Sequence, residues 1–600
     1  MTAQSTHDCR LTDQLLPPLA LPSSCTSGYQ LYPSSTVSEG SIGARFVAIA
    51  EHLAGEAVIR IDGFSGVYWE PFRCQLKEAF KRLGIESTWV DVTEALREPA
   101  AIESMVEPFL GGDDPLFGKQ FIGTLADFFD LQQLAELETS ARGECTVYFG
   151  YGAALLQCPG PLVYVDLPKN EVQFRSRAGA LHNLGTNTTI DAKAQYKRFY
   201  FVDWPVLNAH KGALVDQIDW FIDSQRPEEP TIIAGDELRD ALDRLSHGVF
   251  RVRPWFEMGP WGGQWIKNHI PELPQEVPNY AWSFELIVPE NGLMFSDGKH
   301  LLEVSFDWLM YRNAQAVLGD SFERFGHAFP IRFNFLDTFD GGNLSVQCHP
   351  RNDYIREHFG EPFTQDETYY ILDCLPGSEV YLGFVEGVDP QEFREQLETS
   401  FRDSTEIDVK RYVNTEPTYK HDLFLIPGGT IHCSGVNNLV LEISATTYIF
   451  TFKMYDWLRM DLDGQPRPLN IDRAMDNLDF QRQGDRVAEE FVSHPVEISS
   501  GEDWRLDHLP THREHFYDVH RWEFESEVTG STDGSPQVMA LVEGSRVIVE
   551  TEQMRQQFNY VETFVIPAAA GKYKLINPDG GRAMVVKAFM KPSCDRHRKG

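Results

Sequence analysis

The chain has 600 residues, enough for about four domains of ordinary size, and its 53 Lys and Arg against 89 Asp and Glu give a formal net charge of −36. So strong a negative charge excludes wrapping around nucleic acid by counterion release and binding to anionic membrane surfaces. Nine cysteines without a CxxC pair argue against a disulfide scaffold or a thiolate zinc site, and no apolar run reaches the roughly 20 residues of a membrane span, so a soluble cytoplasmic protein is expected.

Five segments follow one another along the chain. The first is rich in Pro, Ser and Thr and has little core of its own. The second alternates apolar strands with helical patterns, which predicts an α/β domain with a mainly parallel sheet. The third and fifth are dense in strands and turn signals, with helical insertions at about 305–320 and 390–402 in the third, and the fourth is charged and loop-like. The predicted boundaries, in this order, are residues 1–45, 46–248, 249–460, 461–512 and 513–591.

The first strand of the α/β segment is followed by a glycine-containing turn and a helix, the setting of a phosphate-binding P-loop. Residues 62–70 read DGFSGVYWE. A working loop needs GxxxxGK[ST], in which backbone N–H groups and a lysine hold phosphate and a hydroxyl holds magnesium. Here the lysine and hydroxyl positions are apolar or acidic. The segment therefore resembles nucleoside-kinase-like P-loop domains in outline only, and a structural strand–turn–helix is the favoured interpretation.

Two other polar features of this segment have alternative interpretations. The loop GGDDPLFGK at residues 111–119 places adjacent carboxylates near a lysine, as a metal or ligand loop would, but solvated turns carry Asp and Gly as often. The pairs Arg175/Arg177 and Lys197/Arg198 could contact an anion, or they could be surface charge. Neither feature assigns a role to the segment.

Four potential metal ligands lie in the third segment. In the strand LSVQCHP, at residues 344–350, alternate side chains share a face, so Gln347 and His349 point together. Glu367 lies in a second strand pattern, DETYYIL, and His432 follows the turn PGGTI. Two imidazoles, a carboxylate and an amide oxygen suit zinc best, with iron, manganese or cobalt as alternatives. A single histidine here would more often be a buried core residue, but the joint pattern favours a metal site.

These segments resemble the class I mannose-6-phosphate isomerases, a family of zinc enzymes with cupin barrels. LSVQCHP is similar to that family's LS-x-Q-x-HP strand, and GGTIHC to its G-T-x-H turn. Further similar stretches are WGG at residues 261–263, LEIS at 441–444, YDWLR at 455–459 and RPLNI at 467–471. The resemblance covers about residues 250–590. It implies a double cupin whose second jelly-roll barrel is the last segment, and one zinc ion per chain held by Gln347, His349, Glu367 and His432.

The resemblance also implies an activity, the interconversion of mannose 6-phosphate and fructose 6-phosphate. A proton then moves between C1 and C2 through a cis-enediol, which needs a Lewis acid at the developing oxyanion and a base beside the C1–C2 edge. Glu442, Asp422 and Lys453 are the candidates for that base. The expected partner is a small sugar phosphate, and the sequence carries no signal for an oligomeric state.

The sequence departs from the family pattern at three basic positions. Many members have a lysine where Gln365 and Asn334 stand here, and often an arginine where Lys453 stands. Because Arg and Lys are the usual phosphate ligands, these changes leave the substrate open. The remaining candidates for phosphate contacts are Arg459, Arg467, Lys420 and Lys572. Arg459 joins Lys453 and Glu442 as a predicted catalytic residue.

Several alternatives stay open. Arg459 and Arg467 have an equal claim to be surface charge in a polar crossover. The enzyme could act on another, unphosphorylated sugar, or the chain could be a non-catalytic protein that senses sugar phosphates. In the last segment His512, His515 and His520 form no recognised ligand pattern, which favours a structural lobe over a second metal site.

Overall fold

The computed structural model describes residues 9–22, 28–112, 114–139, 143–188, 190–460 and 467–592. Asp113 of the predicted polar loop and residues 461–466 of the predicted crossover lie outside the described residues. The chain divides into two compact units. Unit 1 comprises Met1–Ser23, Tyr32–Leu245 and Pro289–Asn313, and unit 2 comprises Ser24–Leu31, Ser246–Val288 and Ala314–Gly600. Within the described ranges, no helix is long and apolar enough to cross a membrane.

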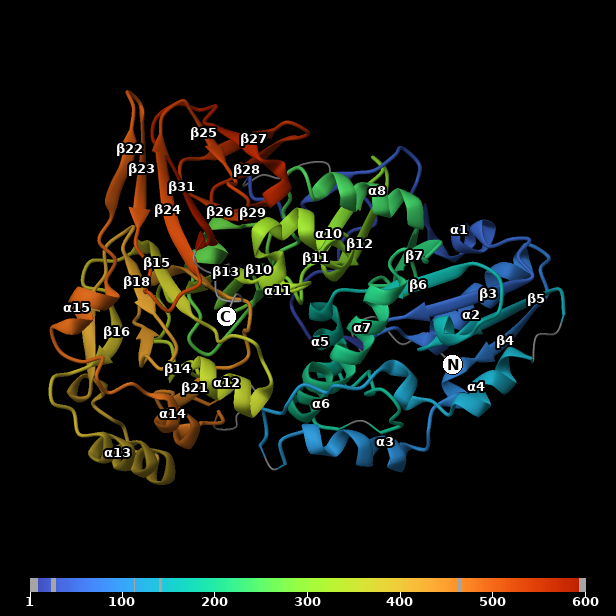
Figure 1. Ribbon diagram of the computed structural model, residues 1–600, viewed down its shortest axis with the longest axis horizontal. Coiled ribbons are helices and arrows are strands. Elements are labelled where there is room, and N and C mark those ends of the chain that lie inside the picture. Colours follow the sequence, from blue (N-terminus) through green and yellow to red (C-terminus); the bar gives the residue numbers. More distant parts are fainter. Residues whose placement is uncertain are drawn as a thin grey trace. The chain divides into compact units, whose positions relative to one another are not determined.

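Unit 1 is built on a seven-stranded sheet of order β2-β8-β7-β6-β3-β5-β4 (Figure 1). The strands from β7 to β4 are parallel, β8 is antiparallel to β7, and β2 is antiparallel to β8. Both β5 and β6 are buried along their whole length, as central strands of a sheet with two covered faces should be. The strands of this sheet are β2 (Gly43–Ala44), β3 (Val58–Gly63), β4 (Ser87–Asp91), β5 (Cys145–Phe149), β6 (Leu162–Asp166), β7 (Trp220–Asp223) and β8 (Thr231–Ala234). The helices of the unit are α1 (Arg45–His52), α2 (Trp69–Arg82), α3 (Pro99–Val106), α4 (Leu131–Glu138), α5 (Lys169–Arg177), α6 (Ala192–Arg198), α7 (Trp204–Leu214) and α8 (Gly235–Leu245).

Unit 1 also contains a hairpin from the middle of the chain. Residues 289–313 lie within the predicted third segment, yet they pack with the α/β unit. Strand β11 (Gly292–Ser296) pairs with β12 (Leu301–Ser305) and, in parallel, with β1 (Ser34–Thr36). The helix α10 (Asp307–Leu318) follows, at the site of the first predicted helical insertion. The chain passes from unit 1 to unit 2 at Leu245, close to the predicted boundary at residue 249, but the segment Pro289–Asn313 returns to unit 1.

The turn after β3 has the expected strand–turn–helix form. The cations near it, two lysine ammonium groups, lie over the aromatic ring of Phe64. Phe64 follows β3, and the ammonium groups of Lys211 and Lys169 lie 4.5 and 5.1 Å from its ring centre. Both lysines are buried, on α7 and α5. The likeness of this unit to a P-loop domain stays a prediction.

The carboxyl end of β6 is occupied by the protein's own side chains. Asp166 ends the strand and accepts hydrogen bonds of 2.8 Å from the Ser305 amide and from Trp308 Nε1. Its second oxygen lies 2.9 Å from Lys211 Nζ. The carboxyl ends of parallel strands are where α/β sheets usually bind ligands. Here residues from the 289–313 segment satisfy the carboxylate instead.

Of the basic residues singled out in this unit, Arg175 and Arg198 hold its loops together, which corrects their interpretation as surface charge, whereas Arg177 is exposed. Arg175 is buried and donates to the carbonyls of Gly66, at 2.8 Å, and of Ser224 and Gln225, each at 3.0 Å. Arg198 is buried and donates to the Leu184 carbonyl at 2.7 Å. These guanidiniums satisfy carbonyl groups that lie outside regular secondary structure.

Unit 2 contains two pairs of largely antiparallel sheets. The first pair has six strands in the order β18-β15-β20-β13-β10-β9 and five in the order β17-β16-β19-β14-β21. Its strands are β9 (Trp255–Glu257), β10 (Trp282–Leu286), β13 (Ile331–Asp337), β14 (Val346–Cys348), β15 (Glu367–Cys374), β16 (Glu379–Phe384), β17 (Val413–Pro417), β18 (Leu423–Ile426), β19 (His432–Ser434), β20 (Asn438–Ala445) and β21 (Phe452–Tyr455). The helices of the unit are α9 (Trp265–His269), α11 (Phe322–Phe325), α12 (Asn352–Phe359), α13 (Pro390–Asp403), α14 (Ile471–Asn477) and α15 (Arg486–Phe491). Helix α13 is the second predicted helical insertion.

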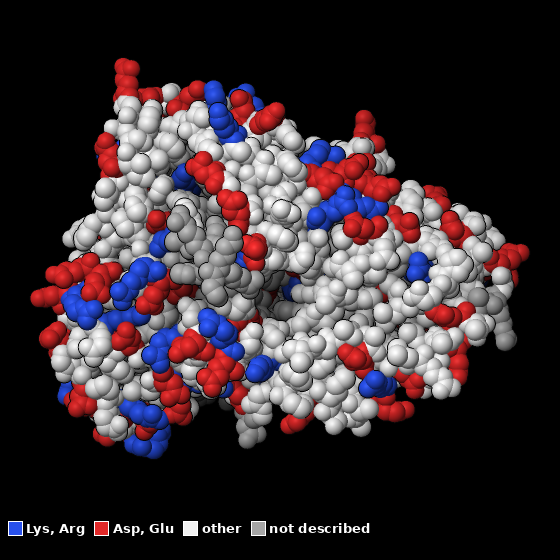
Figure 2. Space-filling model, in the orientation of Figure 1, with Lys and Arg blue, Asp and Glu red and all other residues white. Residues whose placement is uncertain are grey.

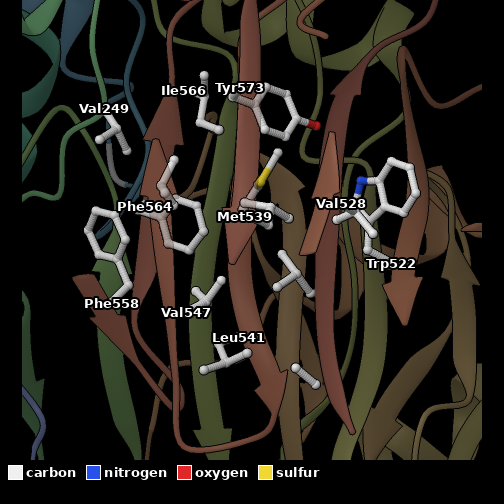
Figure 3. Packing of buried hydrophobic residues seen from close by; sticks show 14 of the residues in the cluster. Val249, Trp522, Val528, Met539, Leu541, Val547, Phe558, Phe564, Ile566 and Tyr573 are labelled. Carbon is white, nitrogen blue, oxygen red and sulfur yellow. The ribbon is translucent and has the colours of Figure 1, made fainter. Parts of the chain in front are cut away.

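The second pair of sheets has strand orders β22-β23-β24-β31-β26-β29 and β25-β30-β27-β28. Its strands are β22 (Val496–Ser500), β23 (Trp504–Leu509), β24 (Tyr517–Phe524), β25 (Glu527–Ser531), β26 (Gln537–Glu543), β27 (Arg546–Thr551), β28 (Arg555–Asn559), β29 (Thr563–Ile566), β30 (Lys572–Ile576) and β31 (Ala583–Met590). Figure 3 shows the apolar cluster between these sheets, with Met539 and Phe564 from one and Val547, Phe558 and Tyr573 from the other. The two cupin barrels themselves stay a prediction.

Acidic and basic side chains are interspersed on the face seen in Figure 2, rather than separated into large fields of one sign. Many of the surface charges are paired locally. Arg312 lies 3.1 Å from Asp243, and Arg486 lies 3.0 Å from Glu490 on the same helix. Such exposed pairs contribute little stability, about 0–1 kcal/mol each. A bound anion would therefore depend on particular basic side chains near its site.

Candidate metal centre

Three of the four predicted ligands meet between the two sheets of the first pair in unit 2. Gln347 on β14 and His432 on β19 are directly opposite each other in an antiparallel pair, so their side chains share a face. His349 follows β14 by one residue, and Glu367 begins β15 in the other sheet. His349, Glu367 and His432 form a buried cluster whose ligand atoms all lie within 4.8 Å of one another.

The distances within the cluster are those of a preformed ligand set. Glu367 Oε2 lies 2.8 Å from His349 Nε2 and 3.1 Å from His432 Nε2. A tetrahedral zinc ion would separate such ligand atoms by about 3.4 Å, so small side-chain movements suffice. The Gln347 amide nitrogen lies 3.3 Å from His432 Nε2. Turning this amide over brings its oxygen to the same place, because the two atoms are assigned only from hydrogen bonding.

The remaining ring nitrogens fix the orientation of both imidazoles. His349 Nδ1 is 3.1 Å from the Phe450 carbonyl, and His432 Nδ1 is 2.9 Å from the Thr430 carbonyl. A carbonyl only accepts, so each Nδ1 carries the proton and each Nε2 presents its lone pair to the cluster. Metal-binding histidines are held in this way. The donor set therefore fits a borderline divalent ion such as zinc.

Burial and mutual contact set the charges of the cluster. Burial lowers the pKa of His349, although the neighbouring Glu367 carboxylate raises it, so the ring is neutral and able to bind metal at neutral pH. Burial raises the pKa of Glu367, but its close contacts with His349 and His432 outweigh this and lower it overall. The structure thus has a neutral His349 ring in contact with the Glu367 carboxylate.

A second polar layer, which the sequence analysis did not single out as such, lies beside the cluster on the six-stranded sheet. Arg332 on β13 donates from Nε to Ser444 Oγ at 2.9 Å and pairs through Nη2 with the Glu442 carboxylate. Glu442 also accepts from Ser444 Oγ at 2.7 Å and from Asn334 Nδ2 at 2.9 Å. All four residues are buried. Arg332 lies two residues before Asn334, so strand alternation alone would have placed both on one face.

Gln365 and Tyr369 complete this layer. In the orientation that satisfies its neighbours, the Gln365 amide donates to the carbonyls of Thr447 and Tyr448, and its oxygen accepts from Arg332 at 2.8 Å. The Tyr369 ring meets the His432 ring edge-on, with 5.8 Å between centres. Its hydroxyl is buried and has no hydrogen-bond partner within the described part of the chain. This hydroxyl is available to a ligand placed next to the cluster.

The other predicted catalytic and phosphate-binding residues fall into two groups. Lys453 lies directly opposite Gln347 on β21, on the side away from His432, and therefore shares their face. Arg459 and Arg467 both contact Asp456, at 2.7 and 2.9 Å. Two guanidiniums on one carboxylate leave a net positive charge, and Asp456 is tied to the strand by Ser345 Oγ at 2.7 Å. These arginines are therefore partly buried members of an ion-pair cluster, not charge on a free crossover.

Three candidates lie away from the cluster. Asp422 precedes β18 at the end opposite Ile426, and Ile426 is the residue that pairs with Glu367. Four residues of strand separate the two ends, or about 13 Å. Lys420 and Lys572 are exposed. The structure thus does not bring Asp422 to the metal ligands, and this corrects its place among the candidate bases.

The fold and the site together define a protein with paired β-sheets and a His–Glu–His cluster able to hold a metal ion, joined to an α/β unit. The chain is homologous to mannose-6-phosphate isomerases over about half of its length. The probable mannose-6-phosphate isomerase GmuF of Bacillus subtilis (strain 168) is 26% identical over 337 residues, which cover 55% of this chain and 96% of that protein. The mannose-6-phosphate isomerase ManA of the same organism is 24% identical over 328 residues, covering 54% and 94%.

Two further comparisons concern the N-terminal segment and the solved structures. Residues 45–247 match the model of a family described as a domain of unknown function (DUF8485). A crystal structure of the mannose 6-phosphate isomerase from Bacillus subtilis has a TM-score of 0.46 and 18% identity, covering 57% of this chain and 99% of that chain. A score this low does not equate the two folds.

Proposed function

We propose that the protein is a zinc-dependent aldose–ketose isomerase that interconverts mannose 6-phosphate and fructose 6-phosphate. The observation that carries the proposal is the convergence of His349, Glu367 and His432, with Gln347 beside them. Homology to proteins named mannose-6-phosphate isomerase supports the substrate. In this proposal the four residues hold one zinc ion, which supplies a Lewis acid for the oxyanion that develops at O1 or O2.

Glu442 is the proposed carrier of the proton between C1 and C2. Its Oε1 accepts from Ser444 and Arg332, whereas its Oε2 accepts from Asn334 and keeps one acceptor position without a partner among the described residues. Arg332 and Asn334 hold the carboxylate in place, which serves orientation during transfer. A carboxylate with one oxygen available in a buried site has the position a general base requires.

The phosphate end is assigned to Lys453 on the five-stranded sheet and to two arginines that follow its strand β21 along the chain. Lys453 shares a face with Gln347, and Arg459 and Arg467 share Asp456 close to the same strand. Ser345, which holds Asp456, is two residues before Gln347, about 7 Å along β14. Guanidinium groups bind phosphate with two parallel hydrogen bonds, so this pair is the proposed phosphate contact, and Lys453 lies directly opposite the predicted metal ligand Gln347.

The test is a coupled isomerase assay together with metal analysis on wild type and His432→Ala. Loss of one of two imidazoles should remove the zinc bound at this cluster and the activity. The control His358→Ala changes an exposed histidine on α12 and should keep both. An active His432→Ala protein, or a zinc-loaded wild type without activity on any sugar phosphate, would contradict the proposal.

One observation favours a second candidate substrate, an unphosphorylated sugar. Gln365 and Asn334 stand where the resemblance places lysines, and the cation beside them, Arg332, is neutralised by Glu442. Activity on mannose 6-phosphate should be compared with activity on free mannose and lyxose. Higher kcat/KM for a free sugar, unchanged in Arg459→Ala, would support the second candidate over the first.

A further inference from the structure

A second group of metal-binding side chains lies on the last pair of sheets, far along the chain from the first. His508 on β23 and His520 on β24 are direct partners in an antiparallel pair (Figure 1). Asp518 is two residues before His520, so all three side chains share one face. The ligand atoms lie within 4.8 Å of one another. His508 Nε2 is 2.9 Å from Asp518 Oδ2, and the ring centres of His508 and His520 are 5.1 Å apart.

The carboxylate is held so that one oxygen faces the imidazoles. Asp518 Oδ1 accepts from Thr511 Oγ1 at 3.1 Å and from the Val519 amide at 3.1 Å. Oδ2 is left for His508. The chemistry of one carboxylate oxygen and two imidazoles matches the ligands that zinc takes in proteins.

His520 has an unsatisfied nitrogen, which points independently to a ligand. Its Nδ1 is buried and has no hydrogen-bond partner within the described ranges. The ring packs edge-on against Phe589, at 4.7 Å between centres, which limits its rotation. A buried ring nitrogen without a partner is costly unless something else binds it.

One neighbour opposes a cation at this site. Lys587 on β31 is the direct partner of His520, and its ammonium group lies 5.5 and 5.7 Å from the ring centres of Phe589 and Trp522. The ammonium group thus lies over two aromatic rings, whose faces attract a cation.

We propose that His508, Asp518 and His520 form a second metal site, for a divalent ion of the zinc class, with its remaining coordination positions open to solvent. His508 is 32% exposed and Asp518 18% exposed, so the ion enters directly from solvent. The bound ion links β23 to β24. Because β22 is exposed and pairs only with β23 in its sheet, the ion also fixes this edge hairpin to the rest of the sheet.

The experiment measures zinc bound per chain after equilibration with buffered zinc, using the full-length protein. Wild type should hold two equivalents, His520→Ala and Asp518→Asn one each, and His432→Ala one. The matched control His512→Ala removes a neighbouring histidine that lies outside the cluster and should keep two. Isomerase activity of His520→Ala should equal that of wild type, which separates this site from the first.

A second readout guards against variants that fold poorly. Adding zinc to protein already loaded at the first site should raise the unfolding temperature of wild type and of His512→Ala, and should leave Asp518→Asn and His508→Gln unchanged. One equivalent in wild type, lost only in His432→Ala, would overturn the proposal. So would two equivalents retained in His520→Ala and Asp518→Asn alike.

Discussion

Arg332 shows how a single residue can decide the chemistry of the site. Its guanidinium is buried beside Glu442, Ser444 and Gln365, and burial lowers its pKa to about 10 against the opposing effect of the nearby Glu367 carboxylate. We expect Arg332→Met to leave Glu442 as an unpaired buried charge and to lower the free energy of unfolding by about 3–5 kcal/mol. Urea unfolding of the zinc-loaded protein measures this.

The companion variant separates stability from catalysis. Arg332→Met combined with Glu442→Gln removes both charges and should recover most of the lost stability, while activity stays low because the proton carrier is gone. The exposed Arg324→Met serves as a control and should change neither. A double variant as unstable as Arg332→Met, or one with wild-type activity, would show that the pair does not act as proposed.

Asp337 makes stability depend on pH. It ends β13 and accepts from the amides of Ile266, at 2.8 Å, and Phe339, at 2.9 Å, and burial raises its pKa to about 7 despite these bonds. Between about pH 4 and 7 the native carboxyl keeps a proton that the unfolded chain has released, so the free energy of unfolding falls as pH rises through this window.

The loss is on the order of 4 kcal/mol once pH exceeds 7, from a pKa difference of about three units. Unfolding midpoints in urea at several pH values measure it. Asp337→Asn should flatten the dependence, whereas exposed Asp408→Asn should leave it intact. An unchanged slope in Asp337→Asn would mean that other groups cause it.

The metal ligands are the part of the site that sequence reasoning reached best. Gln347 and His432 were grouped from motifs, and their direct pairing across β14 and β19 follows from strand alternation. Arg332 was missed because its partners Glu442 and Gln365 lie 110 and 33 residues further along the chain. Such a network depends on strand order, which local patterns do not contain.

At the scale of the element, the turn before β19 positions His432. Gly429 has φ +83°, and a Cβ atom there would lie 2.6 Å from the Asn477 carbonyl oxygen. Its amide donates to the His349 carbonyl at 2.8 Å, so the turn ties both histidines together. We expect Gly429→Ala to displace the turn and to weaken zinc binding at least tenfold, because only glycine fits both the backbone and the space.

The matched control is Gly377→Ala. Gly377 has φ +88°, nearly the same as Gly429, but a Cβ atom there meets nothing within 4 Å. This variant carries the backbone strain without the clash, and its zinc affinity should equal that of wild type. Equal zinc affinity in all three proteins, measured by competition with a chelator, would show that the turn tolerates a side chain.

Close packing also explains why two glycines occur in the stretch WGG at residues 261–263, which sequence reasoning used only as a family signature. A Cβ atom on Gly262 would lie 2.1 Å from Asn279 Oδ1, and one on Gly263 2.1 Å from Asp337 Oδ1. Gly263 thus lets the polypeptide approach the buried carboxylate at the end of β13, and Gly262 lets it approach Asn279. The sequence pattern identified this stretch, but the glycines are required by tertiary contacts, which a local pattern does not contain.

At the scale of the whole molecule, the net charge of −36 leaves the basic residues of the site acting against the field of the chain. The described basic residues around the metal ligands are largely shared with acids, as in Arg459 and Arg467 on Asp456. The alternation of strands and helices indicated the α/β unit, whereas its hairpin from residues 289–313 was not foreseen. The sequence of a hairpin specifies how its two strands pair. It does not specify which unit the hairpin packs against.

That hairpin makes the two halves of the chain interdependent. Residues 289–313 depend on unit 1 for their packing, through Ser305 and Trp308 on Asp166 and through the pairing of β11 with β1. A fragment of residues 249–600 would therefore carry an apolar hairpin without its core. We expect it to be largely insoluble when expressed alone, and to become soluble and to bind zinc when residues 1–248 are co-expressed as a separate chain. The variant Asp166→Ala in the co-expressed chain should weaken this rescue, whereas exposed Asp236→Ala should not. A fragment 249–600 that is soluble alone and as stable as the full chain would show that the hairpin does not need its partner.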